Sequence, residues 1–170
     1  MSTKYITEVL KEINDDPSLF NTTYKKNGNG GPLGLLFFHA FTAQGKFLLP
    51  EGTPPFRPDD APIGMSPVRF ISEIQKLRNF CRTDLRPMKR ETMFVQLCEA
   101  IHPDEAKILV AIKDQKLTEL YPNITRKAVA EAGFIPPLTP EQLAQEETEV
   151  KKSARPRGRP RKSASPQPVL

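Results

Sequence analysis

The spacing of apolar residues along this chain predicts helices. Near the start, apolar residues recur at i, i+3, i+4 and i+7, the period of a helix that buries one face. They are Ile6, Val9, Leu10 and Ile13. The run LGLLFFHAFTAQG at residues 33–45 is almost wholly apolar but too short to cross a bilayer. It predicts a buried helix that ends at Gly45.

Helical spacing continues through the second half of the chain. Ser66-Pro67 can begin a helix, and the apolar residues after it share one helical face: Phe70, Ile71, Ile74, Leu77 and Cys81. The same period recurs at residues 89–101 and 104–117. In NITRKAVAEAG, residues 123–133, we expect a short helix with Thr125 as its N-cap and Gly133 as its stop.

Two segments are loops by composition. Residues 27–34 (NGNGGPLG) are rich in glycine and asparagine. Residues 48–67 contain six prolines in twenty residues, which favours neither a helix nor a central strand. Since no segment shows a convincing strand pattern, the sequence predicts an all-α fold, a compact helical bundle.

Length and composition place this bundle in a single domain with appendages. Of the 170 residues, 38% are hydrophobic and 18 are proline, which fits a modest core with long irregular segments. No run approaches the roughly 18 apolar residues of a membrane span, so we expect no membrane contact. We divide the chain into a helical domain (1–137), an acidic linker (138–150) and a disordered basic tail (151–170).

The positive charge is concentrated in that tail. Residues 151–170 hold seven Lys and Arg and no acid, whereas the other residues hold 18 bases and 20 acids, a net charge of −2. No apolar amphipathic face accompanies the basic residues. The asymmetry therefore indicates a basic arm for a polyanion, with nucleic acid favoured over a membrane.

The order of residues in the tail is specific. Arg157-Gly158-Arg159-Pro160 matches the AT-hook motif. Gly158 lets the backbone approach the floor of the minor groove, and Pro160 fixes an extended direction. The narrow, electronegative groove of A·T-rich DNA attracts guanidinium groups. The flanking residues Arg155, Arg161 and Lys162, with Lys151 and Lys152, would then contact phosphates. The alternative is a non-specific, solubilising basic tail.

A second basic run lies in the domain. Residues 69–90 carry seven Lys and Arg against two acids. Arg78, Arg82 and Arg86 fall at i, i+4 and i+8, so the first two would share a helical face if one helix reaches them. Such a stripe could follow phosphates, or it could be a solvated helix surface.

No pattern of catalytic or metal-binding residues is present. His39 and His102 lack spaced Cys or His partners, so we expect a core and a cap histidine, with no metal and no cofactor. Cys81 and Cys98 stand alone, which predicts buried free thiols and an intracellular location. No glycine-rich loop with a following Lys-Ser or Lys-Thr is present. The sequence therefore favours a protein that is not an enzyme.

The stretch from Glu91 to Pro136 resembles the end of the N-terminal DNA-binding domain of ATP-dependent DNA ligases, most closely those of T-even-type phages. Three pieces carry the resemblance: LCEAIHPDEAKILVAIKDQ, KLTELYP and ITRKAVAEAGFIP. Weaker similarity extends over residues 1–137. The Lys-x-Asp-Gly nucleophile motif of a ligase is missing, since KDQK at residues 113–116 lacks the glycine. The resemblance implies the DNA-binding fold without the chemistry, in a tailed phage.

The resemblance also implies a mode of binding. The helical module would lie across the minor-groove side of duplex DNA and grip phosphates with helix N-termini and basic side chains. The matching positions are Thr125, Arg126 and Lys127, at the start of the last helix. The alternative is that Thr125 is only a cap and that the two bases lie on a solvated face.

Together these features predict a non-enzymatic protein that binds double-stranded DNA, with A·T-rich DNA preferred, and that lies with DNA inside the cell. One alternative is an adaptor or virion component that binds a protein partner and is tethered to DNA by its tail. Another is an accessory factor that delivers nicked DNA to a separate ligase.

Overall fold

The computed structural model describes residues 4–20, 31–62, 64–137 and 139–141. The chain divides into two units, residues 1–137 and residues 138–170. Only Thr139–Glu141 of the second unit belong to the described residues. The architecture that follows is therefore that of the first unit.

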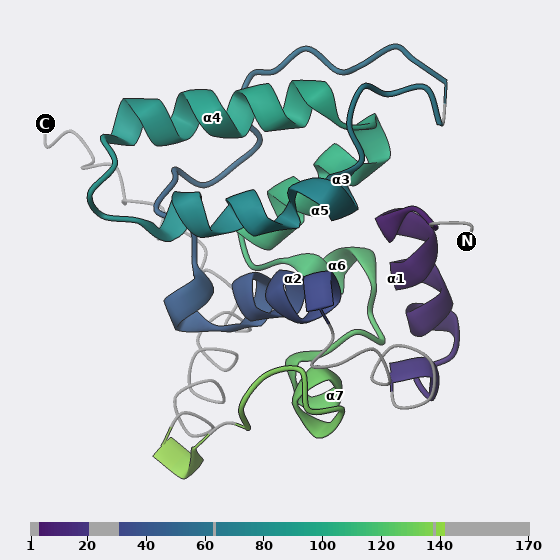
Figure 1. The fold of residues 1–170 in the computed structure, drawn as a ribbon. Coiled ribbons are helices and arrows are strands. Elements are labelled where there is room, and N and C mark those ends of the chain that lie inside the picture. Colours follow the sequence, from purple (N-terminus) through teal and green to yellow (C-terminus); the bar gives the residue numbers. More distant parts are fainter. Residues whose placement is uncertain (1–3, 21–30, 63, 138, 142–170) are drawn as a thin grey trace, which may run out of the picture. The chain divides into compact units, whose positions relative to one another are not determined.

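The described residues of this unit form helices and no strand, which confirms the predicted all-α class. Two of the elements, η2 and η3, are 3₁₀ helices. In chain order the elements are α1 (Ile6–Asp15), α2 (Gly31–Phe41), η2 (Ala43–Gly45), α3 (Phe70–Glu73), η3 (Ile74–Cys81), α4 (Pro87–Ala100), α5 (Pro103–Lys113), α6 (Leu117–Leu120) and α7 (Arg126–Glu131) (Figure 1).

Helix α5 is the centre of the bundle. It packs against α1, α2, α4 and α6, and its residues Ile108, Leu109 and Ile112 are buried. The segment η3 contacts both α2 and α4, so these three elements form one side of the unit (Figure 1). The four apolar residues predicted for the first helix all lie in the core.

Aromatic contacts join η3 to α4. The ring centroids of Phe47 and Phe80 are 5.2 Å apart, and those of Phe80 and Phe94 are 5.4 Å apart. Tilted and edge-on arrangements at these distances are favourable for aromatic rings. The three rings fix the segment after η2 between η3 and α4, where the backbone N–H of Leu48 also donates to Phe80 O.

The helix predicted at residues 33–45 has different ends. It begins at Gly31, inside the predicted loop 27–34, and it ends at Phe41. The Thr42 hydroxyl stops it by donating to Phe38 O and accepting from Gly45 N, which starts η2. Gly45 is not a left-handed helix cap; a Cβ there would lie 2.4 Å from Phe38 O, so close packing demands the glycine.

The helix predicted from Ser66 begins at Phe70 and then tightens. After α3 the chain continues as a 3₁₀ helix, whose period is about 3 residues. Its buried residues therefore fall at Ile74, Leu77 and Phe80, and the predicted core residue Cys81 is only half-buried. In the described part of residues 48–67 the chain is irregular, as predicted.

Candidate nucleic-acid interface

The predicted AT-hook lies outside the described residues. This concerns Arg155, Arg157, Gly158, Arg159, Pro160, Arg161 and Lys162. The hook remains a prediction from the sequence, and the structure bears on the six candidate residues of the helical domain.

Arg78, Arg82 and Arg86 are all exposed, but they do not form a stripe on one helix. Arg78 belongs to η3, which ends at Cys81, and Arg82 already has extended backbone angles. Arg86 is the N-cap of α4 and is also extended, since Pro87 after it disfavours helical geometry at this position. The expected helical register is therefore wrong, and a turn replaces it.

Arg90 holds this turn in place. Its guanidinium is largely buried, with the residue 7% exposed. Its Nη1 donates to Arg82 O at 2.9 Å and to Leu85 O at 2.6 Å, and its Nε donates to Leu48 O at 3.1 Å. A buried charge needs such acceptors. The sequence counted Arg90 among the basic residues but gave no signal that it binds the backbone.

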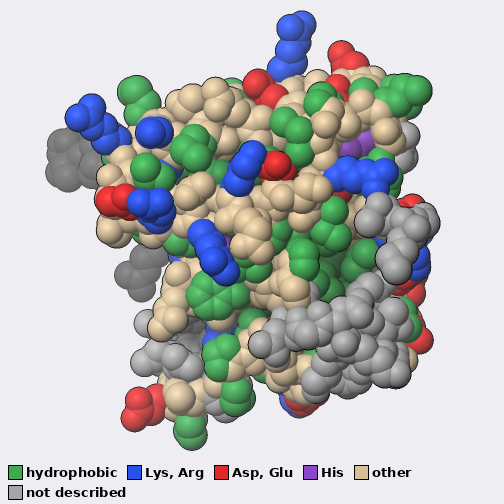
Figure 2. Space-filling model, viewed as in Figure 1, with side chains coloured by type: hydrophobic (Ala, Val, Ile, Leu, Met, Phe, Trp, Pro, Cys, Tyr) green, Lys and Arg blue, Asp and Glu red, His purple; other side chains and the backbone are tan. Residues whose placement is uncertain are grey.

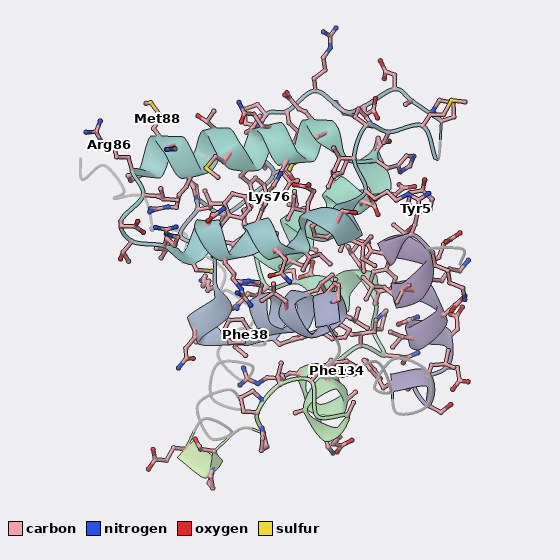
Figure 3. All side chains as sticks on the ribbon, in the orientation of Figure 1. Tyr5, Phe38, Lys76, Arg86, Met88 and Phe134 are labelled. Atoms are coloured by element: carbon pink, nitrogen blue, oxygen red, sulfur yellow. The ribbon has the colours of Figure 1, made fainter. Side chains whose placement is uncertain are left out.

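Four exposed cations lie on this turn and on the elements that flank it, and we call them the basic corner: Arg78 near the end of η3, Arg82 and Arg86 in the turn, and Lys89 in the first turn of α4. Figure 2 shows Lys and Arg side chains over these ends of η3 and α4, and Figure 3 shows Arg86 extending away from the ribbon. Among the described residues, no acid lies within ion-pair distance of Arg78, Arg86 or Lys89. These three charges are therefore available to an anion.

Arg82 differs from the other members of the basic corner because it is already paired. Its Nε and Nη2 donate to the two Asp84 oxygens at 2.9 and 2.6 Å. These hydrogen bonds lower the pKa of the Asp84 carboxyl. Both side chains are exposed, so a phosphate can compete with the carboxylate for the guanidinium. We expect Arg82 to contribute less to anion binding than its neighbours.

The second candidate group, at the start of α7, is mostly used within the fold. Thr125 is the N-cap, as predicted, and its hydroxyl accepts from Ala128 N at 3.2 Å. The Arg126 guanidinium donates to Phe41 O at the end of α2. Lys127 is exposed and lies 3.9 Å from Glu131. Of the three, only Lys127 directs its charge to solvent, and α7 has just 6 residues.

A cavity of about 400 Å³ lies beside the basic corner, and the sequence did not predict it. Its walls come from α2 and η3: Leu35, Phe38, His39, Arg78 and Cys81. The lining residues of α2 are 39 or more positions away from those of η3, so periodicity within either element could not pair them. Arg78 belongs both to this wall and to the basic corner.

His39 has a defined protonation state in this wall. The residue is 2% exposed, and its Nδ1 lies 2.9 Å from Gly45 O. A carbonyl only accepts hydrogen bonds, so Nδ1 carries the proton and Nε2 is left as an acceptor. Burial, and to a lesser extent the charge of Arg78, lower the pKa of His39. Nε2 is buried and has no hydrogen-bond partner in the described part of the chain.

The cysteines and the second histidine are also placed. Cys81 is half-buried, and its thiol donates to Gly45 O at 3.2 Å; Cys98 is buried, which raises its pKa to about 12. His102 caps α5 by accepting from Asp104 N, as predicted. Within the ranges that the structure describes, no three His, Cys, Asp or Glu side chains are grouped to hold a metal ion. None of the described helices is long and apolar enough to cross a bilayer.

Fold and site together define a small helical protein with a basic corner next to a partly aromatic cavity. The chain belongs to the family of unknown function DUF6433, whose model matches residues 23–119. No curated protein and no solved structure matches the chain. The matched range includes α2 to α5, and hence the basic corner and the cavity, whereas α7 and the basic tail lie beyond it.

Proposed function

We propose that this protein binds double-stranded DNA without catalysing a reaction on it. The basic corner holds phosphates, and the tail reads the minor groove of A·T-rich DNA as an AT-hook. The observation that carries the proposal is the group of exposed cations at the basic corner, three of them without an acid in reach among the described residues. It lies in a part of the chain, residues 1–150, whose net charge is −2.

The basic corner supports this proposal by its form. Arg90 and the backbone carbonyls of the turn fix the positions from which Arg82 and Arg86 project. Phosphate contacts of this kind bind and orient without reading sequence. The tail contributes what the corner lacks, because two arginines around a glycine fit a narrow groove that presents only acceptors in A·T steps.

The ligase resemblance implies that residues at the start of α7 grip phosphates. Thr125 and Arg126 make contacts within the fold, which favours the basic corner over α7 as the phosphate contact in this proposal. If the protein binds nicked duplex more tightly than intact duplex, the ligase-like orientation on DNA stays part of the proposal; otherwise it does not. A comparison of nicked with intact duplexes decides between a general DNA-binding protein and a factor that delivers nicks.

The test is a salt titration of full-length protein on intact, nicked, A·T-rich and G·C-rich duplexes by fluorescence anisotropy. Changing Arg78, Arg86 and Lys89 to Ala together should weaken binding to all of them. The slope of log affinity against log salt should fall by about 0.9 per lost phosphate contact, so by about 3 if all three contribute. The matched control changes Lys11, Arg57 and Lys116, three exposed cations elsewhere, and should leave the slope almost unchanged.

A second candidate, the protein-binding adaptor, is favoured by a different hollow. An apolar groove of about 520 Å³ lies between α4 and the segment from Leu49 to Pro55. Met88 lines it and is 79% exposed, which is unusual for a large apolar side chain. If full-length protein raises the anisotropy of no duplex at low salt, the DNA-binding proposal is wrong, and a protein-binding adaptor becomes the better account.

A further inference from the structure

The cavity beside the basic corner has the size and composition of a ligand site. Its volume of about 400 Å³ lies in the range of roughly 300–1,000 Å³ that small-molecule sites occupy. Leu35 and Phe38 supply apolar and aromatic wall, and Arg78 supplies charge. These side chains determine which class of ligand fits the cavity.

The aromatic wall favours a flat ring. Phe38 is half-buried, and it is not among the described side chains that pack against the core, whereas Leu35 of the same helix is. Its ring stands edge-on to that of His39, with centroids 5.4 Å apart. A nucleobase gains roughly 5- to 150-fold in affinity from stacking on an aromatic side chain. Phe38 lies at the wall of the cavity and does not pack against the core, so its ring is suited to stack on a base.

The polar atoms complement a base and its phosphate. His39 lines the cavity as a neutral ring, and its Nε2 is a buried acceptor without a partner in the described part of the chain, so a base reaches it only if the side chains that cover it move. The amino groups of adenine, cytosine and guanine are donors. Arg78 is exposed and has no acidic partner among the described residues, so it can bind the attached phosphate.

Two other uses of the cavity fit less well. A reactive thiol would need a thiolate, but burial raises the pKa of Cys81. A metal ion would meet the positive charge of Arg78 and two side-chain ligands at most, His39 and Cys81.

We propose that the cavity receives an unpaired nucleobase of DNA whose backbone lies on the basic corner. This inference rests on the DNA binding proposed above. A base in a strand is favoured over a free nucleotide because three more exposed cations follow Arg78 within eleven residues of the chain: Arg82, Arg86 and Lys89. A free nucleotide would need only Arg78, whereas the neighbouring phosphates of a strand would use the other three.

The test uses full-length protein and two duplexes that contain 2-aminopurine, one with the analogue paired and one with it as a single-base bulge. We expect the bulged duplex to bind about 10-fold more tightly, and its 2-aminopurine fluorescence to rise as the base leaves the stack. Phe38→Ala should remove both effects and keep the affinity for the paired duplex. Phe56→Ala, the loss of another half-buried phenylalanine in the segment between η2 and α3, should keep all three.

A second measurement needs no variant. Cys81 lines the cavity and is half-buried, whereas Cys98 is buried, so N-ethylmaleimide should modify Cys81 before Cys98 in the native protein, slowly because its thiol pKa is raised; the bulged duplex should slow this modification more than the paired one. Equal affinities with equal protection would overturn the base site while leaving DNA binding intact. Binding to neither duplex would overturn the proposed function itself. Displacement of the bulged base by millimolar dAMP, with the paired duplex still bound, would instead assign the cavity to free nucleotides.

Discussion

A single buried carboxyl connects the ends of two helices. Glu105 on α5 is 1% exposed, and its Oε2 accepts from Phe70 N at 3.0 Å, at the start of α3. The backbone N–H of Ile6, at the start of α1, helps to lower the pKa of this carboxyl, whose Oε1 has no hydrogen-bond partner among the described residues. Burial raises the pKa of Glu105 overall, although these donors and the charges of His102 and Arg69 lower it in part. The free-energy cost of burying the ionised carboxylate is therefore felt only at pH values where Glu105 loses its proton.

This cost leads to a prediction about stability. Because the pKa of Glu105 is raised in the folded state, its favourable contribution is present at pH values below the unfolded pKa of about 4.3 and is lost as the pH rises through the folded pKa. Glu105→Gln keeps an oxygen that can accept from Phe70 N but carries no charge. The variant should therefore be more stable than wild type at pH 7 and nearly equal to it at pH 4.

Urea unfolding at pH values from 4 to 8 measures this difference. The control is Glu119→Gln on α6, where the carboxylate is exposed and no such pH-dependent gap is expected. A difference between Glu105→Gln and wild type that stays constant over the whole pH range would show that the charge of Glu105 is not what matters.

For individual residues, the sequence shows the type of side chain but does not predict what surrounds it in the fold. The charge count treated Arg90 and Arg86 alike, yet one is buried on three carbonyls and the other is exposed. The difference depends on Leu48 and Arg82, whose carbonyls meet Arg90 only in the folded chain. Likewise, His39 was correctly placed in the core, but its contact with Gly45 is set by the turn η2.

Among the elements, the end of α2 is the most constrained. Thr42 breaks the helix, and η2 brings Gly45 against the backbone of the last helical turn. A Cβ at Gly45 would lie 2.4 Å from Phe38 O and 2.8 Å from His39 Cα. Backbone atoms cannot swing aside as a side chain can, so η2 or α2 would have to move.

We therefore predict that Gly45→Ala destabilises the protein by about 1–3 kcal/mol, as overpacking of a tight site generally does. The reference variant is Gln44→Ala, an exposed neighbour in η2 that should change stability by no more than about 0.5 kcal/mol. Urea unfolding of both variants gives the comparison. Equal midpoints for Gly45→Ala and wild type would mean that the contact at Gly45 is looser than the structure has it.

Periodicity located the helices but not their ends. Helices α4, α5 and α7 form where the periodicity predicts them. Thr125 is the N-cap of α7, and Gly133 follows its last turn with a positive φ, as predicted. The 3.6-residue period failed over η3, where a tighter helix buries Phe80 in place of Cys81. A 3₁₀ segment has no distinct signature in so short a run, and its contacts with α2 and α4 decide its winding.

For the whole molecule, the all-α class could be predicted because each helix carries its own period. The arrangement of the helices could not, and the basic corner and the cavity depend on it. The cavity is built by η3 with α2, an element far away in the sequence, and the corner by η3 with α4, which follows it after a turn that Arg90 holds. The charges of the corner could be read from the residue types, whereas their position depends on the turn between η3 and α4.

The distribution of charge over the whole chain bears on the two linked DNA contacts that we propose. The tail bears +7 and residues 1–150 bear −2, so each contact by itself should be weak, the corner because of its surroundings and the hook because it is short. Joining two weak contacts in one chain raises affinity through effective concentration, by roughly 10²- to 10⁴-fold. The two contacts should differ in what they read, since only the tail has residues suited to a groove.

The final prediction separates these two contributions. Arg157→Ala with Arg159→Ala should lower affinity for A·T-rich duplex by on the order of 10²-fold, the lower end of the gain from linkage, and should abolish the preference over G·C-rich duplex. The change of Arg78, Arg86 and Lys89 to Ala should weaken both duplexes equally and keep the preference. Parallel anisotropy titrations at one salt concentration compare the two. If the tail variant still discriminates A·T from G·C as wild type does, the RGRP string acts only through its charge, and sequence reading has to be sought in the helical domain.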